Sequence, residues 1–107
     1  MSEMETIVFE IICHGGNAKG LVYEAIACSQ KGEFDKAEQL LKEADEELVQ
    51  AHQIQTNLIQ EEAAGKHHEV SVLFVHAQDH LMTSAEVRSL AENLISMNKR
   101  IYELENK

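Results

Sequence analysis

Proline and tryptophan are absent from this chain of 107 residues, and only five glycines occur in it. An all-β sandwich or barrel needs many tight turns, which draw heavily on proline and glycine. The shortage of both residues therefore argues against an all-β domain and favours long helices. Hydrophobic residues make up 44% of the chain, enough for a folded core, and the length suits a single domain covering residues 1–107.

Positive charge is also scarce, because nine Lys and Arg residues face 19 Asp and Glu residues and give a formal net charge of −10. Such a surface repels the phosphate backbone of nucleic acids and anionic membrane surfaces. No apolar run reaches the length of a membrane-spanning helix, and residues 1–5 lack the basic start of a secretory signal. We therefore expect a cytoplasmic protein that binds no nucleic acid and does not insert directly into a membrane.

Two cysteines, Cys13 and Cys28, fall in one predicted helix, which separates them by about 22 Å. A disulfide requires Cα atoms within about 7 Å of each other. An intrachain disulfide is therefore excluded, and both residues are expected to be buried, reduced thiols.

Apolar residues recur at helical spacing in three segments, at about residues 6–29, 34–64 and 70–103. This pattern predicts an all-α fold, an antiparallel three-helix bundle, because short connections place consecutive helices side by side in opposite directions. His14-Gly15-Gly16-Asn17 puts helix-weakening glycines into the first segment. Since the apolar stripe keeps its phase there, we predict a continuous helix in which Gly15 permits close approach of another backbone, with a kink as the alternative.

The third segment carries two apolar rows. The first row alternates by three and four residues, the spacing of a heptad seam, and consists of Leu73, His76, His80, Thr83, Val87, Leu90, Leu94, Met97, Ile101 and Leu104. The second row consists of Val72, Val75, Asp79 and Met82. A helix that is apolar on two faces must be covered on both. We therefore predict a homo-oligomer with copies of this helix at its centre, with a wide face buried inside a monomeric bundle as the alternative.

Titratable groups occupy apolar positions of these rows at His76, Asp79 and His80. Residues that break the pattern of a well-patterned helix are candidate functional positions. At about 100° per residue the three share one face, whereas Gln78 points about 160° away from His76. Gln78 could therefore serve a site at His76 only from a neighbouring chain.

Three interpretations fit these residues. Two histidines one turn apart can bind a metal ion with a nearby carboxylate, although Ala77 stands where a zincin motif has Glu. A neutral imidazole can also act as a nucleophile and form a covalent intermediate. The third interpretation is a non-enzymatic helical interaction module whose histidines merely pack or bind zinc. His14 and His52 lack a neighbouring group of known role and are expected to be structural.

The segment Val75-His76-Ala77-Gln78-Asp79-His80-Leu81-Met82-Thr83 resembles the active-site segment of enzyme IIA of the lactose/cellobiose class, from the phosphoenolpyruvate-dependent sugar phosphotransferase system. The similarity covers nearly the whole chain in order, because it extends to His14-Gly15-Gly16-Asn17-Ala18, Ala51-His52, Gln55-Thr56, Glu62-Ala63 and Gly65. The resemblance implies a homotrimer of three-helix chains whose third helices surround the three-fold axis.

The same resemblance implies the roles of the residues. His76 would be the phosphorylated histidine of a phosphotransferase component, receiving phosphate from the phosphocarrier protein HPr and passing it to a cysteine of enzyme IIB. Asp79 would lie on the trimer axis, where three carboxylates repel one another unless they are protonated or bridged by a divalent metal ion such as Mg2+. His80 and a neighbour's Gln78 are the candidates for stabilising the phosphoryl group. Ala77 and the His-Gly-Gly-Asn segment favour a cellobiose or β-glucoside type of sugar over lactose.

Overall fold

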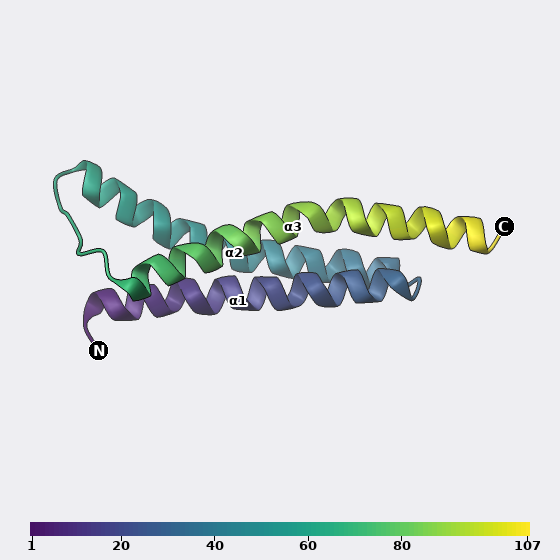
Figure 1. The fold of residues 1–107 in the computed structure, drawn as a ribbon, viewed down its shortest axis with the longest axis horizontal. Helices are drawn as coiled ribbons and strands as arrows, with labels where there is room; N and C mark the ends of the chain where they lie inside the picture. Colours follow the sequence, from purple (N-terminus) through teal and green to yellow (C-terminus); the bar gives the residue numbers. More distant parts are fainter.

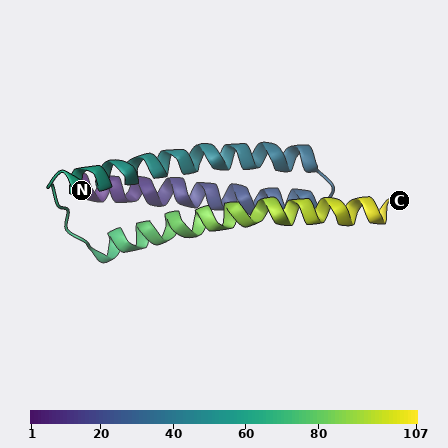
Figure 2. The same ribbon diagram turned by 90° about the horizontal axis from the view of Figure 1, so that it is seen from above.

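Three helices make up the structure, and the chain contains no strand (Figure 1). The computed structural model describes residues 1–107, with α1 at Glu3–Gln30, α2 at Phe34–Ala63 and α3 at Val72–Glu105. α2 returns antiparallel to α1, and α3 again runs in the direction of α1, with its last turns extending beyond the other two helices (Figures 1 and 2). The predicted all-α, antiparallel three-helix bundle is confirmed. None of the three helices combines the length and the apolar character needed to span a bilayer.

The helix bounds differ from the predicted ones by three residues or fewer. Capping explains the differences at two of the starts. The Ser2 hydroxyl accepts a hydrogen bond from the backbone nitrogen of Glu5 at 3.1 Å, so α1 begins before residue 6. The Ser71 hydroxyl accepts one from the backbone nitrogen of Phe74 at 3.1 Å, so α3 begins at Val72 and not at residue 70. The connection between α2 and α3 is correspondingly longer than predicted and covers residues 64–71.

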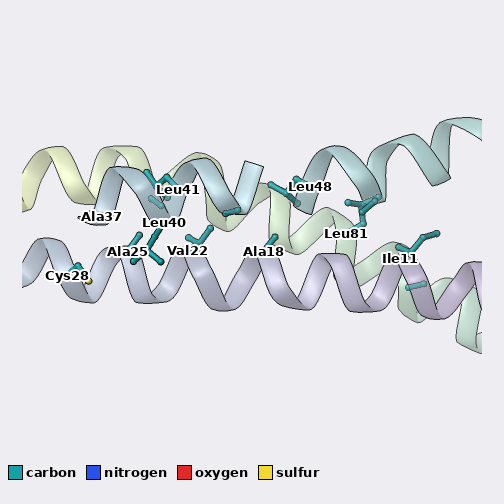
Figure 3. Close-up of a cluster of buried hydrophobic side chains, with 14 of the residues drawn as sticks. Ile11, Ala18, Val22, Ala25, Cys28, Ala37, Leu40, Leu41, Leu48 and Leu81 are labelled. Carbon is teal, nitrogen blue, oxygen red and sulfur yellow. The ribbon is translucent and has the colours of Figure 1, made fainter. Parts of the chain in front are cut away.

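α1 packs against both other helices, whereas α2 and α3 meet over a shorter stretch. Figure 3 shows Val22 and Ala25 of α1 pointing toward Leu40 and Leu41 of α2, and all four side chains are buried. The buried face of α3 is mostly made of small side chains and consists of Ala77, Leu81, Ser84 and Ala91. Small side chains on this face allow α3 to lie close to α1.

Gly15 lies where α1 contacts α3, and the sequence predicts the close approach of another backbone at this residue. α1 continues through residues 14–17 as one helix, so the kink proposed as the alternative does not occur. A β-carbon on Gly15 would lie 3.5 Å from the carbonyl oxygen of His80 and 3.6 Å from the hydroxyl oxygen of Ser84. The predicted close approach of another backbone is confirmed, and the backbone is that of α3.

The heptad seam predicted on α3 is not the face that this chain buries most deeply, although Leu73 and Val87 pack against the core. The four buried residues of α3 each lie one position after a predicted seam residue. The large apolar seam residues Leu90, Leu94, Met97, Ile101 and Leu104 are 43–66% exposed. Small side chains make up most of the face that packs closely on α1, and these five large side chains point outward. The bundle of one chain therefore leaves the seam largely uncovered from Leu90 to Leu104.

The expectation that both cysteines are buried is wrong for one of them. Cys28 is buried in the core, but Cys13 is exposed on the outer side of α1. Its position in the helix is out of phase with the buried stripe, because the neighbouring buried positions are Ile11 and Gly15.

The turn after α1 gives a test of this packing. Gly32 has a φ of +83°, and a β-carbon there would come within 2.6 Å of Cε2 of Tyr102. We expect Gly32→Ala to lower the free energy of unfolding by about 1–2 kcal/mol, because a side chain is strained at this φ and collides with the ring. Denaturant titration measures the change.

Gly20→Ala is the matched control, since a β-carbon on this helical residue meets nothing within 4 Å. It should raise the free energy of unfolding by up to about 1 kcal/mol, because alanine favours helix over glycine. Equal effects of the two substitutions would contradict the assignment of the strained turn.

Candidate functional site

The rings of His76 and His80 touch each other on α3. Their centroids are 4.5 Å apart and their planes are perpendicular, at 90°. His76 is exposed, whereas His80 is half-buried beneath it. The predicted pairing on one face of the helix is therefore present, with one ring exposed at the surface and the other half-buried against it.

The Nδ1 atom of His80 is enclosed by the protein and has no hydrogen-bond partner in the chain. Buried polar atoms are nearly always hydrogen-bonded, so an exception requires an explanation. Enclosure of Nδ1 leaves Nε2 as the ring nitrogen through which His80 can bond to a group attached at His76. It also means that no hydrogen bond to the ring fixes its orientation.

The backbone of His80, unlike its ring, is hydrogen-bonded by a side chain. The hydroxyl oxygen of Ser84 lies 2.6 Å from the carbonyl oxygen of His80 and 2.8 Å from the carbonyl oxygen of Gly15 on α1. The side chain of Ser84 is fully buried between the two helices. A single hydroxyl group therefore joins the helix of the histidine pair to α1.

Asp79 is exposed in the single chain. The hydroxyl of Thr83 donates to the carbonyl oxygen of Asp79 at 2.8 Å and accepts a hydrogen bond from the ammonium group of Lys19 at 3.0 Å. α1 thus supplies a cation to a stretch of α3 that has none of its own. Within one chain, no group of three or more His, Cys, Asp or Glu side chains converges to hold a metal ion, so Asp79 could contribute only one ligand to a larger site.

Gln78 lies on the opposite side of α3 from the histidine pair, as its position in the sequence predicts. Its side-chain oxygen accepts a hydrogen bond from the amide group of Gln55 on α2. It also lines an apolar pocket between the end of α2 and the start of α3, together with Leu58, Phe74 and Val75. The structure does not bring Gln78 to the histidines of its own chain.

His14 and His52 lie apart from the pair. The Nδ1 atom of His14 is 2.6 Å from a carboxylate oxygen of Glu47, and this contact ties α1 to α2. His52 is exposed on α2. The contact of His14 is of the structural kind expected from the sequence.

Lys19 and Ser84 were not predicted as site residues, although Lys19 bonds to Thr83 and Ser84 bonds to the backbone of His80. A signal for them was available in the spacing. Lys19 follows Gly15 by four residues on α1, and Ser84 follows His80 by four residues on α3. Residues four apart share a helix face, so a contact at Gly15 brings these side chains to the same interface.

A family model described as the lactose/cellobiose-specific IIA subunit of the PTS system matches residues 6–99 of the chain. The lichenan-specific phosphotransferase enzyme IIA component of Bacillus subtilis is 46% identical over 101 residues, which cover 94% of this chain and 92% of the relative. The lactose-specific EIIA component of Staphylococcus epidermidis is 41% identical over 98 residues, which cover 92% and 94% of the two chains.

Solved structures agree with these matches. The PTS cellobiose-specific enzyme IIA from Bacillus anthracis superposes with a TM-score of 0.94 at 39% identity and covers 96% of this chain and 94% of its own. A chain from the IIA(chitobiose)–HPr complex of the Escherichia coli phosphotransferase system superposes with a TM-score of 0.82 at 34% identity, over 95% and 99% of the two chains. The similarity therefore extends over the whole bundle and includes the helix of the histidine pair.

Proposed function

This chain belongs to the lactose/cellobiose-specific IIA family of sugar phosphotransferase systems, and from that membership we propose that it is a cytoplasmic phosphocarrier that accepts phosphate from HPr on His76 and passes it to a cysteine of enzyme IIB. Its role in sugar phosphotransfer follows from the family. The acceptor residue, the order in which HPr and enzyme IIB react with it, and the trimeric assembly are proposals.

The observation that carries the assignment of His76 is the exposed ring in contact with a second, half-buried histidine. A carrier that meets two proteins in turn must present its acceptor at the surface. In the first step, a ring nitrogen of His76 forms a bond to phosphorus as the bond between phosphorus and HPr breaks. In the second step, the thiolate of enzyme IIB forms the new bond to phosphorus, and the imidazole of His76 is released unchanged. Catalysis of both steps consists mainly of positioning and charge stabilisation.

His80 supports the phosphoryl group and is not a second acceptor. Its Nδ1 is enclosed, so Nε2–H is the group that can donate a hydrogen bond to a phosphoryl oxygen. Two phosphates on adjacent rings would place about three to four negative charges within a few ångströms of each other on an already acidic chain. A donor instead gains strength as charge builds up in the transition state.

The partners and the sugar are proposed from the relatives. HPr is proposed as the donor because a structural neighbour at 34% identity is described in complex with HPr. A cellobiose-type or β-glucoside sugar is proposed because the structure with a TM-score of 0.94 is described as cellobiose-specific. The relative at 46% identity is described as lichenan-specific.

The two exposed apolar rows of α3 support a homotrimer built around this helix. The row of Val72, Val75 and Met82 is 53–88% exposed in one chain, and Asp79 stands in the same row. Three copies around an axis would cover these residues and bring three Asp79 carboxylates together. The oxygen-donor chemistry of such a set fits a divalent cation such as Mg2+, which would neutralise the carboxylates. Gln78 of one chain is proposed to reach the phosphoryl group on a neighbouring chain.

Replacing the proposed acceptor tests the function directly. His76→Ala should fold and assemble like the wild type but take up no phosphate from HPr in the presence of phosphoenolpyruvate and enzyme I, because no other histidine has its setting. Intact-mass spectrometry at alkaline pH measures the uptake. His52→Ala, which removes an exposed histidine on α2, should be phosphorylated normally. Acid-labile phosphate on the His76→Ala chain would move the acceptor elsewhere, and absence of phosphate on the wild type would favour the non-enzymatic interaction module.

His80→Ala should still carry one phosphate, on His76, but transfer it to enzyme IIB more slowly, by about tenfold to a hundredfold, because one charge-assisted hydrogen bond in the transition state is lost. Rapid-quench kinetics with phosphorylated protein measures the rate. Two phosphates per wild-type chain, or an unchanged rate in the variant, would refute the supporting role.

Asp79→Leu should abolish binding of the divalent cation and keep the trimer, because an apolar axis needs no counter-ion. Light scattering gives the oligomeric state, and metal analysis after dialysis gives the ion content. Glu46→Leu makes the same change of charge on the exposed side of α2 and should retain the metal. A monomeric wild-type protein would contradict the proposed assembly.

A further inference from the structure

Ser84 is fully buried where α1 and α3 meet, four residues after His80. We propose that Ser84 is a positioning residue for the histidine pair: its hydroxyl holds the backbone of His80 against Gly15 and thereby fixes the ring that supports His76. The inference rests on the proposed function for its kinetic consequence, but the geometry on which it depends is independent of that function.

The ring of His80 has no hydrogen bond to hold it. Its Nδ1 is enclosed without a partner, and its contact with His76 is an edge-to-face contact between rings. Such a contact adapts to small shifts of either ring. The position of the ring therefore depends on its packing and on the backbone of His80, and not on a hydrogen bond to the ring.

The backbone of His80 is linked to that of Gly15 by one hydroxyl group, which contacts a carbonyl oxygen of each residue. The hydroxyl oxygen of Ser84 lies 2.6 Å from the carbonyl oxygen of His80 and 2.8 Å from that of Gly15. Two carbonyl oxygens brought together in a water-free contact repel each other, and a shared proton between them removes that repulsion. Gly15 lies directly at this contact, where a β-carbon would be 3.5 Å from the carbonyl oxygen of His80.

A second contact secures the same turn of α3 from the neighbouring turn of α1. Lys19 donates to Thr83, whose hydroxyl donates to the carbonyl oxygen of Asp79. The carbonyl groups of Asp79 and His80 are thus both hydrogen-bonded by hydroxyl groups that face α1. Contacts with α1 therefore fix the position of the turn of α3 that carries His80. Ser84 is the buried residue among these contacts.

The chain offers a matched control in Ser29. This serine is also buried between α1 and α3, where its hydroxyl donates to the carbonyl oxygen of Ile26 at 2.7 Å and accepts a hydrogen bond from Asn98 at 2.9 Å. It lies 14 residues after Gly15 on α1, about 21 Å along the helix axis. Ser29→Ala and Ser84→Ala therefore make the same chemical change in the same kind of interface, but only the second affects the histidine pair.

The kinetic experiment compares transfer from phosphorylated HPr to the wild type, Ser84→Ala and Ser29→Ala. We expect Ser84→Ala to lower kcat by about tenfold with an unchanged KM for HPr, because a misplaced supporting group costs rate and not docking, and Ser29→Ala to change kcat by less than about twofold. Equal kcat values for the two variants, or a loss in Ser84→Ala confined to KM, would overturn the proposal. Ser84→Cys, which keeps a weak donor, should have an intermediate kcat, and a wild-type kcat in this variant would also overturn it. Ser84→Cys decides the test if Ser84→Ala does not fold.

A second measurement needs no phosphate. Nuclear Overhauser contacts between the rings of His76 and His80 should be strong in the wild type and in Ser29→Ala and weaker in Ser84→Ala. Unchanged contacts in Ser84→Ala would refute the positioning role. If the wild type accepts no phosphate on His76 but the ring contacts depend on Ser84, the proposed function fails while the positioning role stands.

Discussion

The close approach of α1 to α3 is the constraint on which the rest of the structure depends. The two helices meet at Gly15 on α1 and at a face of α3 made mostly of small side chains, which includes Ala77, Ser84 and Ala91. Because the two backbones are near each other, a single serine hydroxyl can reach carbonyl groups of both helices. The depth at which His80 sits, and hence the support available to His76, follows from this spacing.

The same constraint decides which side chains α3 leaves outside. Because the buried face of α3 consists mostly of alanine and serine, most of the large apolar residues of this helix lie on its other faces. α3 does so with a row of leucine, methionine and isoleucine residues that one chain leaves about half exposed. Each such side chain is worth about 1.5–3 kcal/mol when it is fully buried. An assembly in which copies of α3 cover one another would therefore recover a stabilisation that the single chain forgoes.

The sequence predicts the helices and the histidine pair well, because both follow from spacing along one helix. His76 and His80 are four residues apart, and any α-helix brings such residues to one face. Spacing does not reveal which of two neighbouring stripes packs on the chain's own core. The stripe through Ala77 and Leu81 is buried and the one through His76 is not, since the distance between α1 and α3 makes that choice. The contacts of Lys19 and Ser84 were not predicted, because they join residues more than 60 positions apart in the chain.

A carrier that exchanges a phosphoryl group with two proteins faces opposing demands on its acceptor. The ring must be exposed, so that each partner can bring its own reacting atom in line, yet an exposed ring has few neighbours to hold it in place. With the proposed roles of His76 and His80, the pair of histidines would divide these demands between two residues. His76 is open to solvent, while His80 is half-buried with one ring nitrogen enclosed. In the proposed arrangement, the ring of His76 is held in place from the interior, through His80, the backbone of α3 and its contact with α1. The surface around His76 then stays free for docking.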